Sequence, residues 1–365
     1  MSLIERVLEN AKERREKILS GKVNCIPSPF KTFRYDFPGV ELGTYYLVSG
    51  NAKASKSKIT NFLFLYNTIL YAYNHPKLVK VKIFYALLEE KAENITGKFI
   101  CYLLYKLSGG KIRIDIKTFK SVDEGRVLSS DILELLNTLE YQSILNFYEE
   151  HVEFIVDRNP TGIYHTLEKY AEANGKIHKK KVEGYDREVF DYYEPNNPEE
   201  YVMCIIDHIG LISTERSMDL RNSIKKLSEY LKIVRNKFNY IPVVVQQQNS
   251  ENNSLEAFKA NKIRPSQKGL LDCQDTSRDA DLFLGITSPY AWELKEYLHY
   301  DITKLKSYAK FLEVVQGRDG ESNAILGMYF DGATGYYAPL PKYDNIPELN
   351  KVYQLIQRNQ ESTSK

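Results

Sequence analysis

The residues best suited to chemistry lie in the stretch from Gly50 to Ser57. Phosphate-binding loops follow the pattern G-x-x-x-x-G-K-[S/T] between a strand and a helix. Gly50, Lys56 and Ser57 match this pattern, whereas Ser55 stands where the second glycine is expected. In such a loop, backbone N–H groups and the lysine bind phosphate oxygens, and the hydroxyl binds Mg²⁺. The stretch therefore predicts a nucleotide site made of Gly50, Asn51, Ala52, Lys53, Ala54, Ser55, Lys56 and Ser57.

Ser55 leaves more than one interpretation of this loop open. Glycine normally occupies that position because its backbone conformation is difficult for other residues and a Cβ atom would crowd the loop. A serine there either weakens nucleotide binding or is small enough to be tolerated. The remaining alternative is a Lys- and Ser-rich loop that precedes a helix and binds no phosphate.

Carboxylates end two of the expected strands. The run 201–207 is largely apolar and ends at Asp207, which we expect to hold Mg²⁺ through water beside the loop. The run 80–88 is followed by Glu89 and Glu90, either of which could polarise an attacking water molecule. The alternative for this pair is a solvated helix cap.

Strands and long helices alternate along the chain, and this order sets the fold class. Strands are predicted at 44–48, 80–88, 153–157, 201–207, 241–246, 281–286, 309–316 and 324–330, and helices at 3–19, 58–73, 93–105, 161–173 and 220–238. Strands joined by helices pair in parallel through right-handed crossovers, and the last two strands are close enough to form a hairpin. We expect a three-layer α/β fold whose mostly parallel, twisted sheet has an antiparallel edge hairpin.

Composition and length exclude several classes of protein. The 365 residues are 43% hydrophobic and carry a formal net charge of +2, which excludes a disordered or polybasic polypeptide. The four cysteines form no C-x-x-C pair and the histidines no ligand spacing, so we expect no zinc site and no disulfide framework. No apolar run approaches about 18 residues and no signal peptide is evident, so we expect a soluble, cytoplasmic protein without a membrane partner.

We expect one large domain with short extensions. Residues 1–24 predict an amphipathic arm, which packs on its own domain or docks on a neighbouring subunit, and 25–36 an extended linker containing prolines. The main domain spans 37–342, with a polar hairpin or insertion at 175–200. Residues 343–365 form a tail with one short helix.

Taken in chain order, these features resemble the DnaB-like replicative DNA helicases, whose motor is a RecA-type P-loop ATPase. The resemblance covers roughly residues 28–340 and adds several short motifs to the phosphate loop. The matching segments are 39–50 with the family's entry strand, FYALLEE at 84–90 with FSLE, IIDHIGLI at 205–212 with IDYLQLI, IPVVVQQQN at 241–249 with VPVIALSQLN, DAD at 279–281 with QDAD, and VVQGRDG at 314–320 with AKQRNG. The family's N-terminal helical domain has no counterpart here.

The resemblance implies roles in an ATPase that uses ATP and Mg²⁺. Alongside the loop lysine, Glu89 would be the catalytic base, with Glu90 as the register alternative, and Gln248 would be the sensor glutamine. Arg318 would reach the γ-phosphate held by a neighbouring subunit, although Gln316 replaces the lysine that the family uses beside it.

The resemblance also implies a homo-oligomeric ring, hexameric in this family, around single-stranded DNA, with a primase or helicase loader as candidate partners. Two polar loops supply candidate DNA contacts, because basic loops bind phosphates without reading sequence. These residues are Arg216 and Arg221 in one loop, and Lys259, Lys262, Arg264 and Lys268 in the other. The alternative for both loops is a solvated surface.

The sequence therefore predicts an ATP-dependent DNA helicase or translocase of replicative type. Two alternatives stay open. One is a RecA-like DNA-dependent ATPase or recombinase that forms filaments. The other is a catalytically weakened DNA-binding ring scaffold, which the replacements Ser55 and Gln316 favour.

Overall fold

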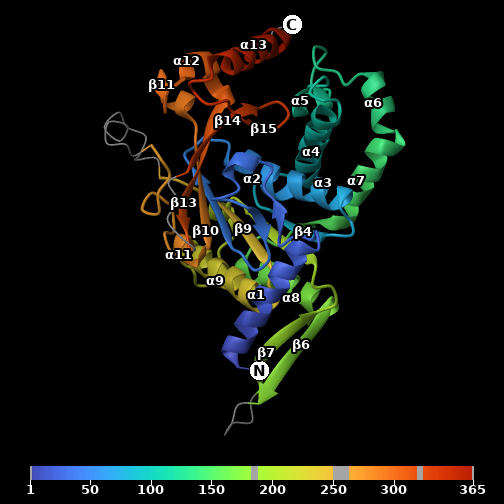
Figure 1. The fold of residues 1–365 in the computed structure, drawn as a ribbon, viewed down its shortest axis with the longest axis vertical. Helices are drawn as coiled ribbons and strands as arrows, with labels where there is room; N and C mark the ends of the chain where they lie inside the picture. Colours follow the sequence, from blue (N-terminus) through green and yellow to red (C-terminus); the bar gives the residue numbers. More distant parts are fainter. Residues whose placement is uncertain (1, 182–187, 250–262, 319–323, 364–365) are drawn as a thin grey trace.

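The computed structural model describes residues 2–181, 188–249, 263–318 and 324–363, and its centre is a nine-stranded sheet (Figure 1). The strand order is β15-β14-β13-β10-β3-β9-β8-β4-β5. The strands are β3 (Tyr46–Gly50), β4 (Lys80–Leu87), β5 (Val152–Ile155), β8 (Glu200–Asp207), β9 (Ile241–Gln247), β10 (Leu282–Thr287), β13 (Ala309–Gly317), β14 (Ile325–Asp331) and β15 (Tyr336–Pro339).

The run of strands from β10 to β5 is parallel throughout, and β13, β14 and β15 continue the sheet in antiparallel pairing. Strands β3, β8 and β9 are rich in Val and Ile and buried almost throughout, as expected for parallel strands covered on both faces. The predicted strands are all present, with ends that shift by up to two residues. Strand β15 was not predicted.

Helices cover both faces of the sheet, which makes the predicted three layers. One face packs against the helix that starts at the phosphate loop and against α4 and α7, and the other packs against α8 and α9. The phosphate-loop helix runs as α2 (Lys56–Thr60), a π-helical segment (Asn61–Tyr66) and α3 (Asn67–Asn74). The others are α4 (Ala92–Leu107), α5 (Ile116–Phe119), α6 (Ser130–Leu136), α7 (Leu139–His151), α8 (Pro160–Ala173), α9 (Leu220–Phe238), α11 (Thr276–Asp279), α12 (Ile302–Leu305) and α13 (Ile346–Thr363).

The N-terminal helix α1 (Leu3–Leu19) has the predicted length and leaves much of its apolar face uncovered. Ile4, Val7 and Leu8 are 72%, 59% and 57% exposed, and Leu19 is 67% exposed. Two ion pairs tie the helix to the body, Arg14 with Glu41 and Lys17 with Glu199. The helix is therefore held in place by charges rather than by burial of its apolar side chains.

The segment predicted as a linker, 25–36, is instead part of the folded domain. Strand β1 (Cys25–Pro27) pairs with β2 (Gly39–Glu41), and Ile26, Phe30 and Phe33 are buried in the core. The prolines keep this segment extended, as predicted, but its large apolar side chains make burial the stable outcome.

Two further parts complete the chain. The polar stretch near 175–200 is a hairpin of β6 (Gly175–Lys181) and β7 (Glu188–Pro195), which projects from one end of the molecule, while α13 lies at the other (Figure 1). The predicted short tail helix is 18 residues long and packs through Leu349 and Ile356. Minor elements are β11 (Glu296–Tyr297), β12 (Tyr300–Asp301) and 3₁₀ turns at Lys31–Phe33, Ile209–Leu211, Pro289–Trp292 and Lys306–Tyr308. Within the described ranges, no helix is both long and apolar enough to span a membrane.

Candidate functional site

The site lies where the parallel strands β3, β9, β8 and β4 end. Register places Gly50 opposite Gln247, and Leu87 opposite Asp207, so the loops that follow these strands meet at one edge. Gly50 also needs its missing side chain. A Cβ atom there would lie 2.5 Å from the carbonyl oxygen of Ile286 on the neighbouring strand, which no side chain tolerates.

The phosphate loop takes the backbone conformation that its pattern predicts, with a serine in place of glycine. Ser55 has φ 73° and ψ 37°, in the left-handed region, and Lys53 is also left-handed at φ 61°. The carbonyl of Ser55 accepts hydrogen bonds from the Ile59 N–H at 3.0 Å and the Tyr337 hydroxyl at 3.4 Å. Serine therefore keeps the loop geometry and bears its conformational cost of about 1–2 kcal/mol.

Lys56 lies at the start of α2 with its side chain largely buried against the loop. Its Nζ donates to the carbonyl oxygen of Asn51 at 3.1 Å. Burial lowers the pKa of Lys56, while the nearby carboxylates of Asp207 and Glu89 act in the opposite direction. A buried ammonium bonded to a single neutral carbonyl is well placed to exchange that partner for a phosphate oxygen.

Asp207 ends β8 and is buried beside the loop hydroxyl. The Ser57 hydroxyl donates to Asp207 Oδ1 at 2.9 Å, and the Tyr85 hydroxyl lies 3.1 Å from Oδ2 and 3.2 Å from Asn61 Oδ1. Burial raises the pKa of Asp207 to about 6, against the hydrogen bonds from Ser57 and Tyr85, which lower it. This carboxylate thus has hydroxyl partners but no ion-pair partner among the described residues.

This environment fits a divalent cation. Mg²⁺ commonly takes one or two protein oxygens and completes its shell with nucleotide phosphates and water. Ser57 and Asp207 offer those oxygens, and a buried carboxylate without a counter-charge gains most from a cation. No cluster of three or more metal-ligating side chains occurs in the described ranges, so a cation here would depend on the nucleotide.

The two carboxylates after β4 differ in their surroundings. Glu90 forms an ion pair with Lys98 on α4. Glu89 is exposed and lines a cavity of about 570 Å³ together with Lys56, Ser57 and His208. Of the two residues, Glu89 is the one without a cation partner in the described part of the chain and the one placed to act on water, which agrees with the register chosen from the sequence.

The glutamine run at the end of β9 corrects one prediction. Gln248, predicted as the sensor, is 1% exposed and turns away from the cavity. Its Nε2 donates to Ser49 Oγ at 2.8 Å, and its Oε1 accepts from the Ser266 N–H at 3.1 Å. Gln247 lines the cavity with Lys56 instead, because neighbouring strand residues face opposite sides. The geometry therefore transfers the candidate sensor position from Gln248 to Gln247.

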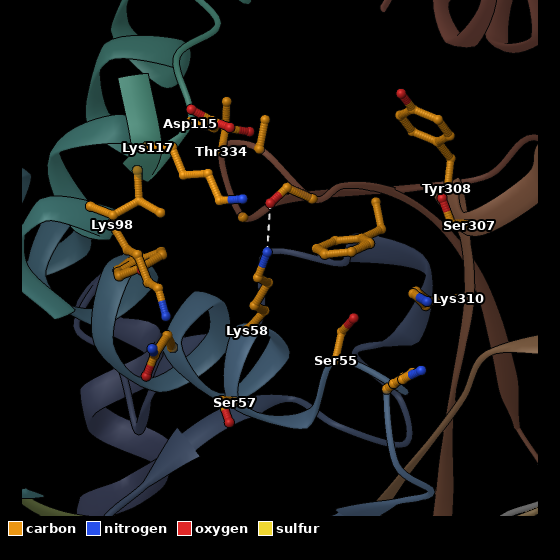
Figure 2. Close-up of a pocket in the computed structure, with 18 of the residues that line it drawn as sticks. Ser55, Ser57, Lys58, Lys98, Asp115, Lys117, Ser307, Tyr308, Lys310 and Thr334 are labelled. Carbon is orange, nitrogen blue, oxygen red and sulfur yellow. Dashed lines mark hydrogen bonds between the residues drawn. The ribbon is translucent and has the colours of Figure 1, made fainter. Parts of the chain in front are cut away.

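A larger cavity of about 880 Å³ adjoins the loop on its other side (Figure 2). Figure 2 shows it between Ser55, Ser57 and Lys58 on one side and Tyr308 and Lys310 on the other. Lys58 Nζ donates to the Gly332 carbonyl at 2.5 Å. Burial and the charge of Lys58 lower the pKa of Lys310 to about 8. Sequence reasoning missed these lysines, although a lysine inside the apolar strand 309–314 was a usable signal.

Arg318 lies at the opposite edge of the sheet from the phosphate loop. Leu282 is level with Tyr46 at the start of β3 and with Gly317 on β13, which places the next residue beyond the amino ends of the parallel strands. Arg318 Nη1 forms an ion pair with Asp281 at 3.1 Å and is 46% exposed. This residue therefore cannot reach the phosphate loop of its own chain.

The predicted DNA-binding residues have diverse surroundings. Arg216, Arg221 and Lys268 are exposed in loops that follow β8 and β9. Arg264 forms an ion pair with the buried Glu313 of β13, so part of its charge already serves the fold. Lys259 and Lys262 lie outside the described residues.

Comparisons with known proteins give no match to a family model and none to a curated protein sequence. Solved structures do match. The ATPase domain of one DnaB-like helicase is similar at a TM-score of 0.61 and 14% identity, over 93% of this chain and all of that one. A DnaB-like replicative helicase, solved in a study of its interactions with primase, is similar at a TM-score of 0.60 and 13% identity, over 93% of this chain and 67% of that one. The chain thus has the RecA-type α/β fold of DnaB-like helicase ATPase domains.

Proposed function

We propose that this protein is an ATP-driven DNA helicase or translocase that acts on single-stranded DNA as a ring of RecA-like domains. One observation carries the proposal. Lys56, Ser57, Asp207 and Glu89 converge at the carboxyl edge of one parallel sheet, around a loop with phosphate-binding geometry. This is the set of groups that phosphoryl transfer needs, because its catalysis consists mainly of positioning and charge neutralisation.

In the proposed reaction, backbone N–H groups of the loop and Lys56 bind the phosphates of ATP. Ser57 and Asp207 would hold Mg²⁺, which supplies positive charge beside the phosphate oxygens. Glu89 orients the attacking water and accepts its proton, and Gln247 contacts the γ-phosphate end of the cavity. Arg318 acts on the nucleotide of a neighbouring subunit, since it lies at the far edge of its own sheet.

The uncovered apolar face of α1 supports an assembly of this kind. Exposed Ile4, Val7, Leu8 and Leu19 lie on a helix that the body holds only by charged contacts at Arg14 and Lys17. A second copy that buries this face would make a head-to-tail contact, and such contacts close into rings or continue as helical filaments. Electron microscopy with ATP and single-stranded DNA distinguishes the two forms.

The test is ATP hydrolysis with and without single-stranded DNA, for the wild type and Lys56→Ala. We expect DNA to stimulate the wild type, and Lys56→Ala to lower kcat roughly 100-fold or more, because one transition-state charge contact is lost. Lys111→Ala, which changes an exposed lysine after α4, is the control and should match the wild type. Equal rates for the wild type and Lys56→Ala would refute the proposal. Nucleotide binding without turnover would support a ring scaffold that has lost catalysis.

A further inference from the structure

His208 directly follows Asp207 and has a ring orientation that its hydrogen bonds define. The backbone N–H of Gly210 donates to His208 Nδ1 at 3.0 Å, so Nδ1 carries no proton and Nε2 is the N–H donor. The ring also hydrogen bonds the side chain of Gln247. With the proton on Nε2, the acceptor is the carbonyl oxygen of the Gln247 amide.

This contact determines which way the Gln247 amide faces. When the amide oxygen accepts from His208, the NH₂ group turns away from the ring. Among the described residues that NH₂ group has no hydrogen-bond partner, and Gln247 lines the same cavity as Lys56 and Glu89. Two amide donors are therefore available to a phosphate oxygen or a water molecule in the cavity.

The ring is also held from a third direction. Asp272 lies close to it across Gly210, because a Cβ atom built on Gly210 would be 2.9 Å from Asp272 Oδ2 and 3.1 Å from His208 Cε1. Asp272 follows the segment that returns from the loop after β9, and the Leu271 N–H donates to the Gln247 carbonyl at 2.8 Å. His208 thus connects the end of β8, the end of β9 and this returning segment.

We propose that His208 is a positioning residue, which holds the amide of Gln247 with its NH₂ donors directed to the γ-phosphate end of the nucleotide cavity. This inference rests on the proposed ATPase and goes beyond it, because it assigns the orientation of the sensor side chain to a residue that touches neither phosphate nor water. Without the histidine, the amide rotates freely and presents its oxygen as often as its donors, and an oxygen repels the phosphate.

The variant His208→Asn tests this role apart from the turn. An asparagine oxygen can still accept the Gly210 N–H, as in an Asx turn, but the shorter side chain loses the donor to Gln247. We expect kcat to fall about 10-fold or more, while KM and the affinity for a non-hydrolysable ATP analogue stay within about two-fold, since the lost interaction acts in the transition state. His165→Asn, at an exposed histidine of α8, is the matched control and should behave as the wild type.

A double-mutant cycle separates positioning from a general structural effect. If His208 acts through Gln247, then Gln247→Ala and the double variant Gln247→Ala/His208→Asn should have the same kcat. Independent, additive losses would overturn the inference, as would a His208→Asn enzyme with wild-type kcat. If His208→Asn does not fold, nitrogen NMR of the wild-type ring decides, because a proton on Nδ1 would overturn it. A wild type that hydrolyses no ATP would instead refute the proposed function, and this inference with it.

Discussion

The two edges of the central sheet use charge in opposite ways. At the amino edge, Asp281 pairs with Arg235 at 2.6 Å and Arg318 at 3.1 Å and also accepts the Tyr45 N–H, so its charge is fully compensated. At the carboxyl edge, Asp207 has only hydroxyl partners and Lys56 only a carbonyl among the described residues. The first arrangement stabilises the fold, whereas the second leaves opposite charges buried near each other and separately available to a ligand.

The largest expected effect belongs to the amino edge. Asp281→Ala leaves Arg235, whose side chain is 9% exposed, without its carboxylate, and removing one partner of a buried pair costs about 3–5 kcal/mol. Urea denaturation followed by circular dichroism measures the loss. Glu348→Ala, which removes an exposed pair with Lys351, should change the free energy of unfolding by no more than about 0.5 kcal/mol. Similar effects of the two changes would show that this edge is not a structural network.

The opposite sign is expected at the carboxyl edge. Burial raises the pKa of Asp207 from 3.8 to about 6, so the folded state disfavours the ionised carboxylate, and the wild type loses stability as the pH rises from 3.8 to about 6. Asp207→Asn should therefore be about 1–3 kcal/mol more stable than the wild type at pH 8, without nucleotide or Mg²⁺, and the gain should shrink toward pH 4. A pH-independent difference, or a loss at pH 8, would contradict the contrast between the edges.

A smaller effect is expected at Tyr85, which connects the carboxylate to the π-helical segment. Tyr85→Phe removes the hydroxyl near Asp207 Oδ2 and Asn61 Oδ1 and should destabilise the fold by about 1–2 kcal/mol. It should also weaken Mg²⁺-dependent nucleotide binding, measured with a fluorescent ATP analogue and with EDTA as reference. Tyr73→Phe, whose hydroxyl bonds Ser143 at 2.7 Å on the surface of α7, controls for loss of a phenol elsewhere. Unchanged Mg²⁺ dependence would mean that Asp207 needs no such support.

The smallest effect concerns the strained serine. Ser55→Gly should raise the free energy of unfolding by about 0.5–1 kcal/mol, because relief of the left-handed strain exceeds the extra entropy of glycine in the unfolded chain. Ser129→Gly, at an extended backbone position before α6, should be neutral or slightly destabilising. If Ser55→Gly also raises affinity for ATP sharply, the serine limits nucleotide binding as well as stability.

The strand order and the phosphate loop could be predicted because they rest on strong local signals. Apolar runs bounded by long amphipathic helices identify the parallel strands, and the loop pattern locates Lys56 and Ser57. The sensor position could not be fixed in this way. The run Gln246-Gln247-Gln248 has one residue type on both faces of the strand, so no periodicity distinguishes the side chain in the cavity from those in the core. The segment 25–36 was misjudged because its prolines were weighed above the buried Ile26, Phe30 and Phe33.

The placement of Arg318 has a consequence for how activity should depend on dilution. One chain carries a phosphate loop at one edge of its sheet and an arginine at the other, so a complete site of the proposed kind always takes two molecules. Hydrolysis per chain should then fall steeply below the concentration at which copies associate. Mixing Lys56→Ala with Arg318→Ala subunits should restore some of the activity that neither variant has alone.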